Sequence, residues 1–418
     1  MVKEFFFIPH KKKVILYAPL HGIIALINSS AASEFKKKIK NGNLITTKNE
    51  LIKAKRPLPK EKDYFKNITF ILTSDCTMQC IYCYANGGES RKILSWDTFK
   101  GTLQYIIGNP QYIENHQLNI SFHGGDITVV WPFFKKAVTH IYKTFADNGI
   151  RTNISVGLNG VLSNVQIDWI IKNINSATIS LDGFAEIQNR QRPLKNKKDS
   201  FKKIDNTLRQ FDKSNFNYGI RSTITKESVN ELDQIVEFFC SSYKVKKIMV
   251  EPIFPMGRGE AILQPNAKNF VFNFRKAKSV AKKYNRELYY SGARMNTTTN
   301  IFCKALENSI VITPDGLISC CYEVLTESNP LSEYFFFGHY DNEKNELIFN
   351  KEKRQKLFDL AVINKEKCRD CFCLFHCAGD CPVKSIYTGL NNKVPVIDRC
   401  FINRALTKDQ ILESIGEE

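Results

Sequence analysis

The feature that most constrains this chain is an alternation between about residues 66 and 260, in which short apolar runs are followed by loops and longer helical segments. Runs rich in β-branched residues indicate strands, and apolar residues at helical spacing indicate helices. The expected strands are 68–73, 118–123, 152–158, 177–181, 218–224 and 246–250, and the expected helices are 96–107, 132–145, 164–171, 201–211 and 230–239. Strands that alternate with helices predict an α/β fold with a parallel sheet, and six such units favour an open, partial barrel. In such barrels the functional residues gather at the C-terminal ends of the strands.

Two regions of different texture flank this barrel. Residues 1–60 contain short apolar runs and one helical segment, which predict a small α+β module, and Pro57 and Pro59 indicate that it ends in a linker. Residues 291–405 hold nine of the thirteen cysteines and show little periodicity. We therefore expect four segments, which are an N-terminal module with its linker over 1–60, a barrel over 61–290, a cysteine-rich domain over 291–405 and a tail over 406–418.

The composition narrows the classes of function. The chain can bury a sizeable core, and it shows neither an apolar stretch of about 18 residues nor a signal peptide, so we expect a cytoplasmic protein without a membrane partner. Thiols stay reduced in that compartment, so thirteen cysteines indicate metal or cluster ligation instead of disulfides. The net charge of +18 suits an acidic peptide partner, whereas nucleic acid is disfavoured because the lysines are dispersed and no nucleic-acid-binding motif accompanies them.

The first cysteine motif comes directly after the first expected strand. Cys76, Cys80 and Cys83 place three thiols within eight residues. Iron-sulfur clusters require thiolate ligands, and three of them would hold three irons of a cubane and leave the fourth without a protein ligand. Spacing alone also allows a zinc knuckle, but the position after the first of six strands disfavours it.

With Tyr82 directly before the last cysteine, this motif resembles the signature of the radical S-adenosylmethionine (SAM) superfamily. The resemblance implies that SAM chelates the open iron, that one electron cleaves it, and that a 5′-deoxyadenosyl radical abstracts hydrogen. Further motifs at later strand ends resemble SAM contacts of that family. They imply cofactor-binding roles for Tyr82, Gly124, Gly125, Asp126, Asn159, Ser180 and Arg221.

Two of these motifs also have a plain structural explanation. Asp126 stands where the family carries Glu, so its side chain is one methylene shorter, and a plain turn at Gly124-Gly125 is the alternative explanation. Ser180-Leu181-Asp182-Gly183 resembles a family stretch in which Asp182 would lie near the reaction cavity, although an ordinary turn after a strand explains Asp182-Gly183 almost as well.

The C-terminal cysteines form a second pattern, which resembles the SPASM domain found after radical SAM barrels that modify peptides and proteins. It comprises seven residues, Cys303, Cys321, Cys368, Cys371, Cys377, Cys381 and Cys400. The resemblance implies one auxiliary 4Fe-4S cluster on Cys368, Cys371, Cys377 and Cys400, and a second held largely by Cys303, Cys321 and Cys381. His376 is expected beside a cluster or at the surface, not as a ligand, and Cys240 is expected in the core.

By the same resemblance, a fully ligated second cluster would take a further cysteine a few residues before Cys303, but residues 291–302 contain none. Cys320 is a possible substitute, but adjacent side chains of a strand point to opposite faces, so it cannot easily act together with Cys321. The sequence therefore favours an open iron that could bind a substrate thiolate.

The N-terminal module helps to decide which members of the family this chain resembles most. Residues 12–35 resemble the peptide-recognition domains of ribosomal-peptide biosynthesis, in which an edge strand pairs with the leader of a precursor peptide. Sulfatase maturases carry Asp directly after the second SPASM cysteine, whereas this chain has Tyr322. We therefore expect a peptide maturase, with Asp182 and Tyr322 as candidate catalytic residues. Its product would carry a thioether, another cross-link or an inverted α-carbon.

The same resemblance implies the cofactors and partners. They are SAM, three 4Fe-4S clusters, a precursor peptide with its leader, and reduced flavodoxin or ferredoxin as electron donor. A sulfatase-type protein maturase remains the alternative enzyme, and a noncatalytic zinc or cluster protein that binds peptides is the alternative from a different class.

Overall fold

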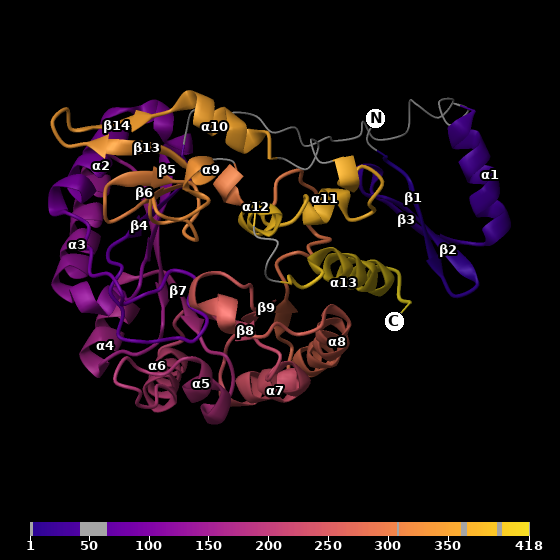
Figure 1. The fold of residues 1–418 in the computed structure, drawn as a ribbon, viewed down its shortest axis with the longest axis horizontal. Coiled ribbons are helices and arrows are strands. Elements are labelled where there is room, and N and C mark those ends of the chain that lie inside the picture. Colours follow the sequence, from indigo (N-terminus) through magenta and orange to yellow (C-terminus); the bar gives the residue numbers. More distant parts are fainter. Residues whose placement is uncertain (1–2, 42–64, 307–308, 361–365, 391–394, 418) are drawn as a thin grey trace.

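A partial barrel of parallel strands forms the centre of the computed structural model, which describes residues 3–41, 65–306, 309–360, 366–390 and 395–417 (Figure 1). Six consecutive strands pair in chain order, each parallel to the next. They are β4 (Asn67–Ile71), β5 (Gln117–His123), β6 (Arg151–Leu158), β7 (Ser176–Ser180), β8 (Tyr218–Ile224) and β9 (Lys247–Pro252). This confirms the predicted fold class, and each strand lies within two residues of its expected bounds.

Helices surround the strands as an arc in Figure 1 and cover one face of the sheet. They are α2 (Trp96–Gly108), α3 (Trp131–Asp147), α4 (Asn164–Asn173), α5 (Ala185–Gln191), α6 (Phe201–Lys213), α7 (Leu232–Ser242) and α8 (Ala267–Lys283). The apolar spacing explains the packing: α6 buries Ile204, Leu208 and Phe211, which lie on one helical face. Ser163 begins α4 with a reciprocal capping box to Gln166, so its sequence determines where that helix starts.

The sheet continues beyond the six predicted strands. On one side β10 (Glu287–Tyr289) pairs with β9, and on the other β11 (Ser309–Ile312) pairs in parallel with β4. The antiparallel strands β12 (Leu317–Ser319), β13 (Phe336–Asp341) and β14 (Glu346–Phe349) follow. Backbone hydrogen bonds therefore join the cysteine-rich domain directly to the first barrel strand.

Short helices complete the cysteine-rich domain. They are α9 (Ser332–Phe335), α10 (Lys351–Phe358), α11 (Leu374–Cys377) and α12 (Pro382–Leu390). The last helix, α13 (Arg399–Ser414), crosses residue 405 without a break. The predicted tail over 406–418 is thus largely the second half of this helix, because Leu406 and Ile411 are buried and anchor it.

The N-terminal module is an antiparallel sheet of β1 (Phe6–His10), β2 (Lys13–Ala18) and β3 (Ile23–Ile27), followed by α1 (Ser29–Lys40). Side chains of β1 alternate between its faces: Phe7 contacts Phe35 of α1, whereas Phe6 packs in a cluster with Ile411 of α13. The sheet therefore lies between its own helix and the end of the chain. The predicted linker around Pro57 and Pro59 lies outside the described residues.

A buried ionic network joins the barrel to the cysteine-rich domain. Arg399 donates to both carboxylate oxygens of Asp380, at 2.7 and 3.0 Å, and to Glu251 of β9 at 3.4 Å. Burial alone would raise the pKa of both carboxyls, but the Arg399 charge lowers it below the usual value. Sequence analysis did not predict this network.

No helix among the described residues is long and apolar enough to cross a membrane.

Replacing Arg399 with Leu leaves two buried carboxylates without their cation. We expect the free energy of unfolding to fall by about 3–5 kcal/mol, measured by chemical denaturation under anaerobic conditions. The matched control is Arg275→Leu, which removes a similarly bidentate but exposed pair with Asp409 and should cost at most about 1 kcal/mol. Equal losses in the two variants would contradict a special role for the buried network.

Candidate active site

The three cysteines of the first motif lie in the loop that follows β4, at the C-terminal end of the barrel strands. Cys80 is buried and the other two thiols are partly buried. The backbone N–H of Met78 donates to the Cys76 sulfur at 3.4 Å, and that of Gly87 to the Cys83 sulfur at 3.3 Å. Burial, and then the Asp126 charge, raise the pKa of Cys76 to about 12, so a thiolate here needs a cation. The irons of a cluster would supply that charge, and three thiols in one loop fit a cluster.

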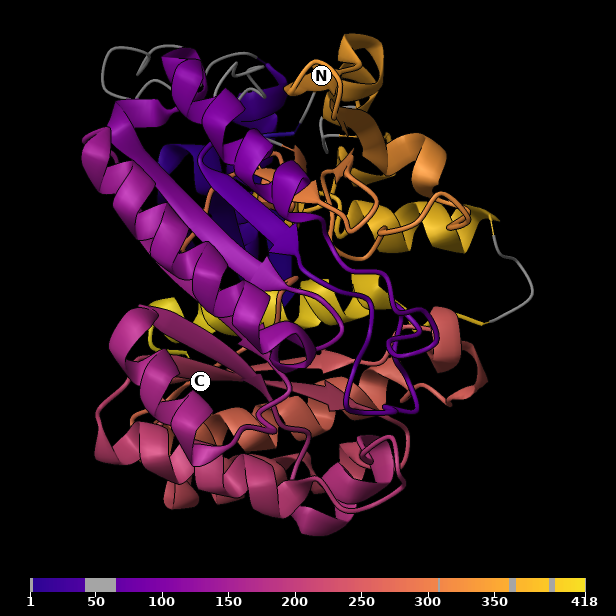
Figure 2. The same ribbon diagram turned by 90° about the vertical axis from the view of Figure 1, so that its left-hand side faces the viewer.

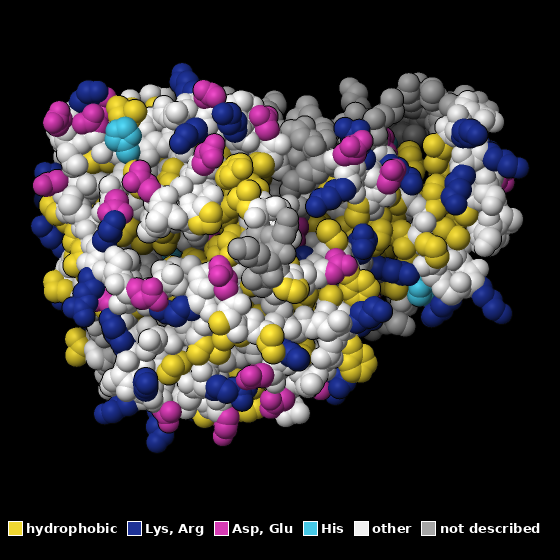
Figure 3. Space-filling view, in the orientation of Figure 1, with side chains coloured by type: hydrophobic (Ala, Val, Ile, Leu, Met, Phe, Trp, Pro, Cys, Tyr) yellow, Lys and Arg dark blue, Asp and Glu magenta, His cyan; other side chains and the backbone are white. Residues whose placement is uncertain are grey.

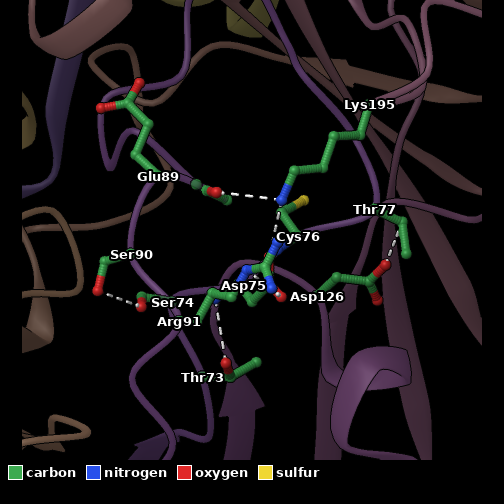
Figure 4. Close-up of polar contacts among 12 residues, drawn as sticks. Thr73, Ser74, Asp75, Cys76, Thr77, Glu89, Ser90, Arg91, Asp126 and Lys195 are labelled. Atoms are coloured by element: carbon green, nitrogen blue, oxygen red, sulfur yellow. Dashed lines mark hydrogen bonds and ion pairs between the residues drawn. The ribbon is translucent and has the colours of Figure 1, made fainter.

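Polar contacts hold this loop in place (Figure 4). Lys195 reaches across to Asp75 at 3.3 Å and to the Gly88 carbonyl at 3.1 Å. From the glycine-rich loop after β9, Arg258 donates to the carbonyl oxygens of Cys80 and Cys83 at 3.0 and 3.1 Å. The loop therefore keeps its shape through contacts that come from distant parts of the chain.

The glycine-rich loop uses two different groups for these contacts: the backbone N–H of Arg258 binds the Cys83 carbonyl, and its side chain binds that of Cys80. The guanidinium also reaches Glu89 at 2.9 Å. Both carbonyls belong to cysteines of the motif, so Arg258 holds the backbone at Cys80 and Cys83.

Gly124 and Gly125 allow the end of β5 to run directly beneath the cysteine loop. A Cβ atom at Gly125 would lie 2.1 Å from the Asp75 carbonyl oxygen, and one at Gly124 would lie 2.6 Å from that of Thr73. The backbone N–H of Gly125 donates to the Thr73 carbonyl at 2.9 Å, and that of Asp126 to the Asp75 carbonyl at 2.8 Å. The two glycines are therefore needed for close approach of two backbones, which a plain turn would not require.

Asp126 and Asn159, both predicted to contact SAM, meet beside Cys76. Asp126 accepts from the Thr77 hydroxyl and, at 2.9 Å, from the Asn159 amide (Figure 4 shows the Thr77 contact). Its other oxygen accepts from the backbone of Thr128 at 2.9 Å. The shorter carboxylate is thus held against the cysteine loop, where its charge suits a cationic amino group.

Asp182 is fully buried, and both of its carboxylate oxygens are hydrogen-bonded. One oxygen accepts from Tyr82 at 2.5 Å and from Gln191 at 2.8 Å, and the other accepts from the backbone of Thr223 at 3.0 Å. Arg192 donates to the Tyr82 hydroxyl at 2.9 Å. These contacts favour a role for Asp182 in positioning Tyr82 and the cysteine motif, in place of the catalytic role expected from the sequence.

Ser180 and Arg221 face each other across the paired strands β7 and β8. The buried Nε of Arg221 has no hydrogen-bond partner among the described residues. An unpaired guanidinium donor at the strand ends fits an anionic group such as the carboxylate of SAM. This orphaned donor is the strongest single indication that the site fits the cofactor.

Tyr322 comes from the cysteine-rich domain and stacks on His123 at the end of β5, with ring centroids 5.2 Å apart and planes inclined by 14°. Burial, together with the Arg221 charge, lowers the pKa of His123 to about 4, so this ring is neutral near pH 7. The structure therefore brings the predicted residue Tyr322 to the mouth of the barrel. Sequence analysis missed His123, whose position one residue before the two glycines was the available signal.

The C-terminal cysteines lie in two groups. Cys303, Cys321 and Cys381 interact electrostatically with one another. In the other group Cys377 interacts with Cys400 and accepts from Asn403 at 3.0 Å, and Cys373 contacts Cys371. Cys368 begins this group in sequence, three residues before Cys371, within a short helical turn.

No three His, Cys, Asp or Glu side chains in the described parts of the chain are arranged to hold a single metal ion.

His376 is not at the surface, since only 2% of it is exposed. Its Nδ1 donates to the Thr297 carbonyl at 2.8 Å, which leaves Nε2 to accept from the hydroxyl of Tyr17 in β2. The surface role considered from the sequence is therefore wrong, because this ring joins the N-terminal module to the turn before Cys377.

A double-mutant cycle tests the positioning role of Asp182. If Asp182 acts through Tyr82, then Asp182→Asn and Tyr82→Phe should be non-additive by about 0.5–3 kcal/mol in the 5′-deoxyadenosine formation implied by the resemblance. Iron content serves as the control for folding. Additive effects, or a loss of hydrogen abstraction from substrate in Asp182→Asn with SAM cleavage intact, would instead support a direct catalytic role.

Comparison with known proteins identifies the two main domains. The model of the radical SAM superfamily matches residues 70–239, and that of the SPASM iron-sulfur cluster-binding domain matches residues 303–372. The chain is 25% identical over 319 residues to the cysteine-type anaerobic sulfatase-maturating enzyme of Clostridium novyi. The aligned region covers 72% of this chain and 83% of that protein.

Solved structures share the fold. The structure of anSMEcpe with bound AdoMet gives a TM-score of 0.63 at 16% identity and covers 84% of this chain and 97% of its own. Streptococcus suis SuiB bound to S-adenosylmethionine gives 0.53 at 14% identity, covering 92% and 96%. These findings confirm the family and the enzyme class predicted from the sequence, with SAM and iron-sulfur clusters as cofactors. The chain is therefore a radical SAM enzyme whose barrel is followed by a SPASM domain.

Proposed function

We propose that this enzyme matures a ribosomally made precursor peptide by abstracting hydrogen from one of its core residues. When bound, the first cluster and SAM supply the chemistry, which is one-electron cleavage of SAM to a 5′-deoxyadenosyl radical. The observation that carries the proposal is the N-terminal sheet, which presents a partly exposed edge strand and is attached to the SPASM domain. An enzyme acting only on small molecules has no evident use for such a strand.

The sheet has two edge strands, β1 and β3, and β3 is the one in which no residue is buried. Among the described residues it pairs only with β2, and all five of its residues are partly exposed. A peptide can add to such an edge through backbone hydrogen bonds. Exposed lysines of α1, including Lys37 and Lys40, follow β3 directly in the chain, and Figure 3 shows Lys and Arg side chains along the outer side of this helix. The edge therefore suits an acidic leader.

The attachment of this sheet to the SPASM domain supports a link between recognition and chemistry. Tyr17 binds His376, and Leu20 packs in one cluster with Leu374 and Phe375 of α11. Figure 2 shows the barrel and its helices side by side with the C-terminal helices.

A sulfatase-type protein maturase is the second candidate, because the Clostridium novyi relative carries that name. The residue after Cys321 speaks against it, since Tyr322 has no carboxylate that could take a proton there. The two candidates also differ in the partner that they need, because only a leader peptide would use β3.

We further propose three 4Fe-4S clusters, one on the first motif and two in the SPASM domain, from the three groups of cysteines. A reduced flavodoxin or ferredoxin would deliver the electron, and the basic surface suits such acidic proteins. Both proteins work in the reducing environment of the cytoplasm, where free thiols also persist.

Reversing charge on α1 tests leader recognition. The double variant Lys37→Glu, Lys40→Glu should bind the precursor peptide about tenfold more weakly, which corresponds to about 1.4 kcal/mol, and the difference should shrink in high salt. Binding is measured by fluorescence anisotropy with a candidate precursor peptide, sought among the short open reading frames that neighbour the gene. SAM cleavage without peptide should not change.

The control is Lys172→Glu, Lys202→Glu, which makes the same charge change at exposed positions of α4 and α6, far along the chain from the module. Equal binding by both double variants would refute recognition at this edge. Modification of a cysteine-containing sulfatase peptide, but of no precursor peptide, would support the second candidate.

The cysteine motif provides the test of the radical chemistry. Replacing Cys76, Cys80 or Cys83 with Ala should abolish 5′-deoxyadenosine formation from SAM with dithionite, because the cluster loses a ligand. Cys240→Ala, in the buried face of α7, should keep this activity and at most lose stability. SAM cleavage retained in any of the three variants would overturn the assignment.

A further inference from the structure

The N-terminal sheet contacts the chain directly beside the cysteines of the SPASM domain. The Lys3 N–H donates at 3.3 Å to the carbonyl of Arg369, which follows Cys368. Phe372, which follows Cys371, packs against the apolar cluster formed by β1, β2 and α13. The sheet therefore borders the segment that supplies the cysteines of one group, which we call the Cys377 group. The other is the Cys303 group, which also contains Cys321 and Cys381.

Leu20, in the short turn between β2 and β3, reaches both groups. It is buried in an apolar cluster with Phe302 and residues of α11. Cys303 and Cys381 of one group and Cys368 of the other pack against this same cluster. A side chain of the N-terminal module is thus part of the apolar surroundings of both sets of candidate ligands.

Tyr17 makes the most direct polar contact between the sheet and the Cys377 group. Its hydroxyl donates to Nε2 of His376, the residue before Cys377, and both side chains are buried. The ring of His376 is also fixed at its other nitrogen, because Nδ1 donates to the Thr297 carbonyl at 2.8 Å. With both nitrogens held, a displacement of Tyr17 would be passed on to the backbone that leads into Cys377.

Arg294 connects the same backbone to the Cys303 group. Its guanidinium donates to the His376 carbonyl at 2.9 and 3.2 Å and to the Phe302 carbonyl at 2.5 Å, and it lies 4.9 Å from the centre of the Phe302 ring. His376 precedes Cys377, and Phe302 precedes Cys303. One planar cation therefore holds together the two backbones that lead into the two groups.

We propose that Tyr17 and Arg294 are positioning residues for the two auxiliary clusters. Arg294 fixes the two ligand segments relative to each other, and Tyr17 fixes His376 from the N-terminal sheet. The sheet is then a structural part of the cluster sites, besides carrying the edge proposed for the leader. The potential of an iron-sulfur cluster depends on the hydrogen bonds and the water around its ligands, and a shift of the sheet would change both. The inference rests on the two auxiliary clusters proposed above, and not on the nature of the peptide.

The experiment uses the full-length chain with Cys76, Cys80 and Cys83 all changed to Ala, so that only the auxiliary clusters contribute. Into this background we introduce Tyr17→Phe, which removes only the hydroxyl, or Arg294→Met, which removes every donor to the two carbonyls. After anaerobic reconstitution, iron and sulfide are measured, electron paramagnetic resonance spectra of the reduced clusters are recorded, and their midpoint potentials are determined by redox titration.

Two matched controls make the same chemical changes away from the cysteines. Tyr142→Phe removes a hydroxyl that donates to the exposed Asn173 carbonyl at 2.9 Å. Arg209→Met removes an exposed guanidinium that pairs with Asp205 within α6. Both controls should match the parent in iron content, spectrum and potential.

We expect Tyr17→Phe to keep the iron of the parent, since no ligand is lost, and to shift the spectrum and the potential of one cluster. Arg294→Met should shift both clusters, or lose iron from both, with the circular dichroism spectrum unchanged. Parent values in Tyr17→Phe would refute the role of the sheet, and a change confined to one cluster in Arg294→Met would refute the bridge. A parent without iron would refute the auxiliary clusters themselves, and this proposal with them.

Discussion

Pairing of β4 on both of its edges is the constraint on which the rest of the structure depends. This strand is parallel to β5 on one side and to β11 of the SPASM domain on the other. Its C-terminal end leads into the cysteine loop, so the backbone that positions the SAM cluster is continuous with the sheet that carries the SPASM cysteines. A shift in the register of β4 would displace both sites together, since neighbouring strands move as one hydrogen-bonded unit.

The barrel was predictable because its strands and helices have strong and regular patterns. The expected strand 152–158 and the observed β6 (Arg151–Leu158) differ by one residue, and the expected helix 164–171 falls inside α4. The strands β10, β11 and β12 were not predicted, because three or four residues are too few for a periodic signal. The helical character of residues 406–414 was also missed, since it becomes clear only when Ile411 is seen against the N-terminal sheet.

For the active site, the sequence identified individual side chains but not the residues that each of them contacts. The spacing of the cysteines is local, so it could be read directly. The contact between Tyr82 and Asp182 joins residues one hundred positions apart, and the close approach of Gly125 to Asp75 depends on the pairing of two strands. No sequence pattern contains such distances.

The packing of the N-terminal sheet on α13 has a consequence for the design of chimeric enzymes. Phe6, Ile8 and Ile15 share a cluster with Ile411, and Lys408 donates to the Pro9 carbonyl at 2.6 Å. The N-terminal sheet and α13 thus pack together as one unit. A recognition module transplanted from another enzyme would meet a foreign helix surface, so the module and α13 should be exchanged as a matched pair.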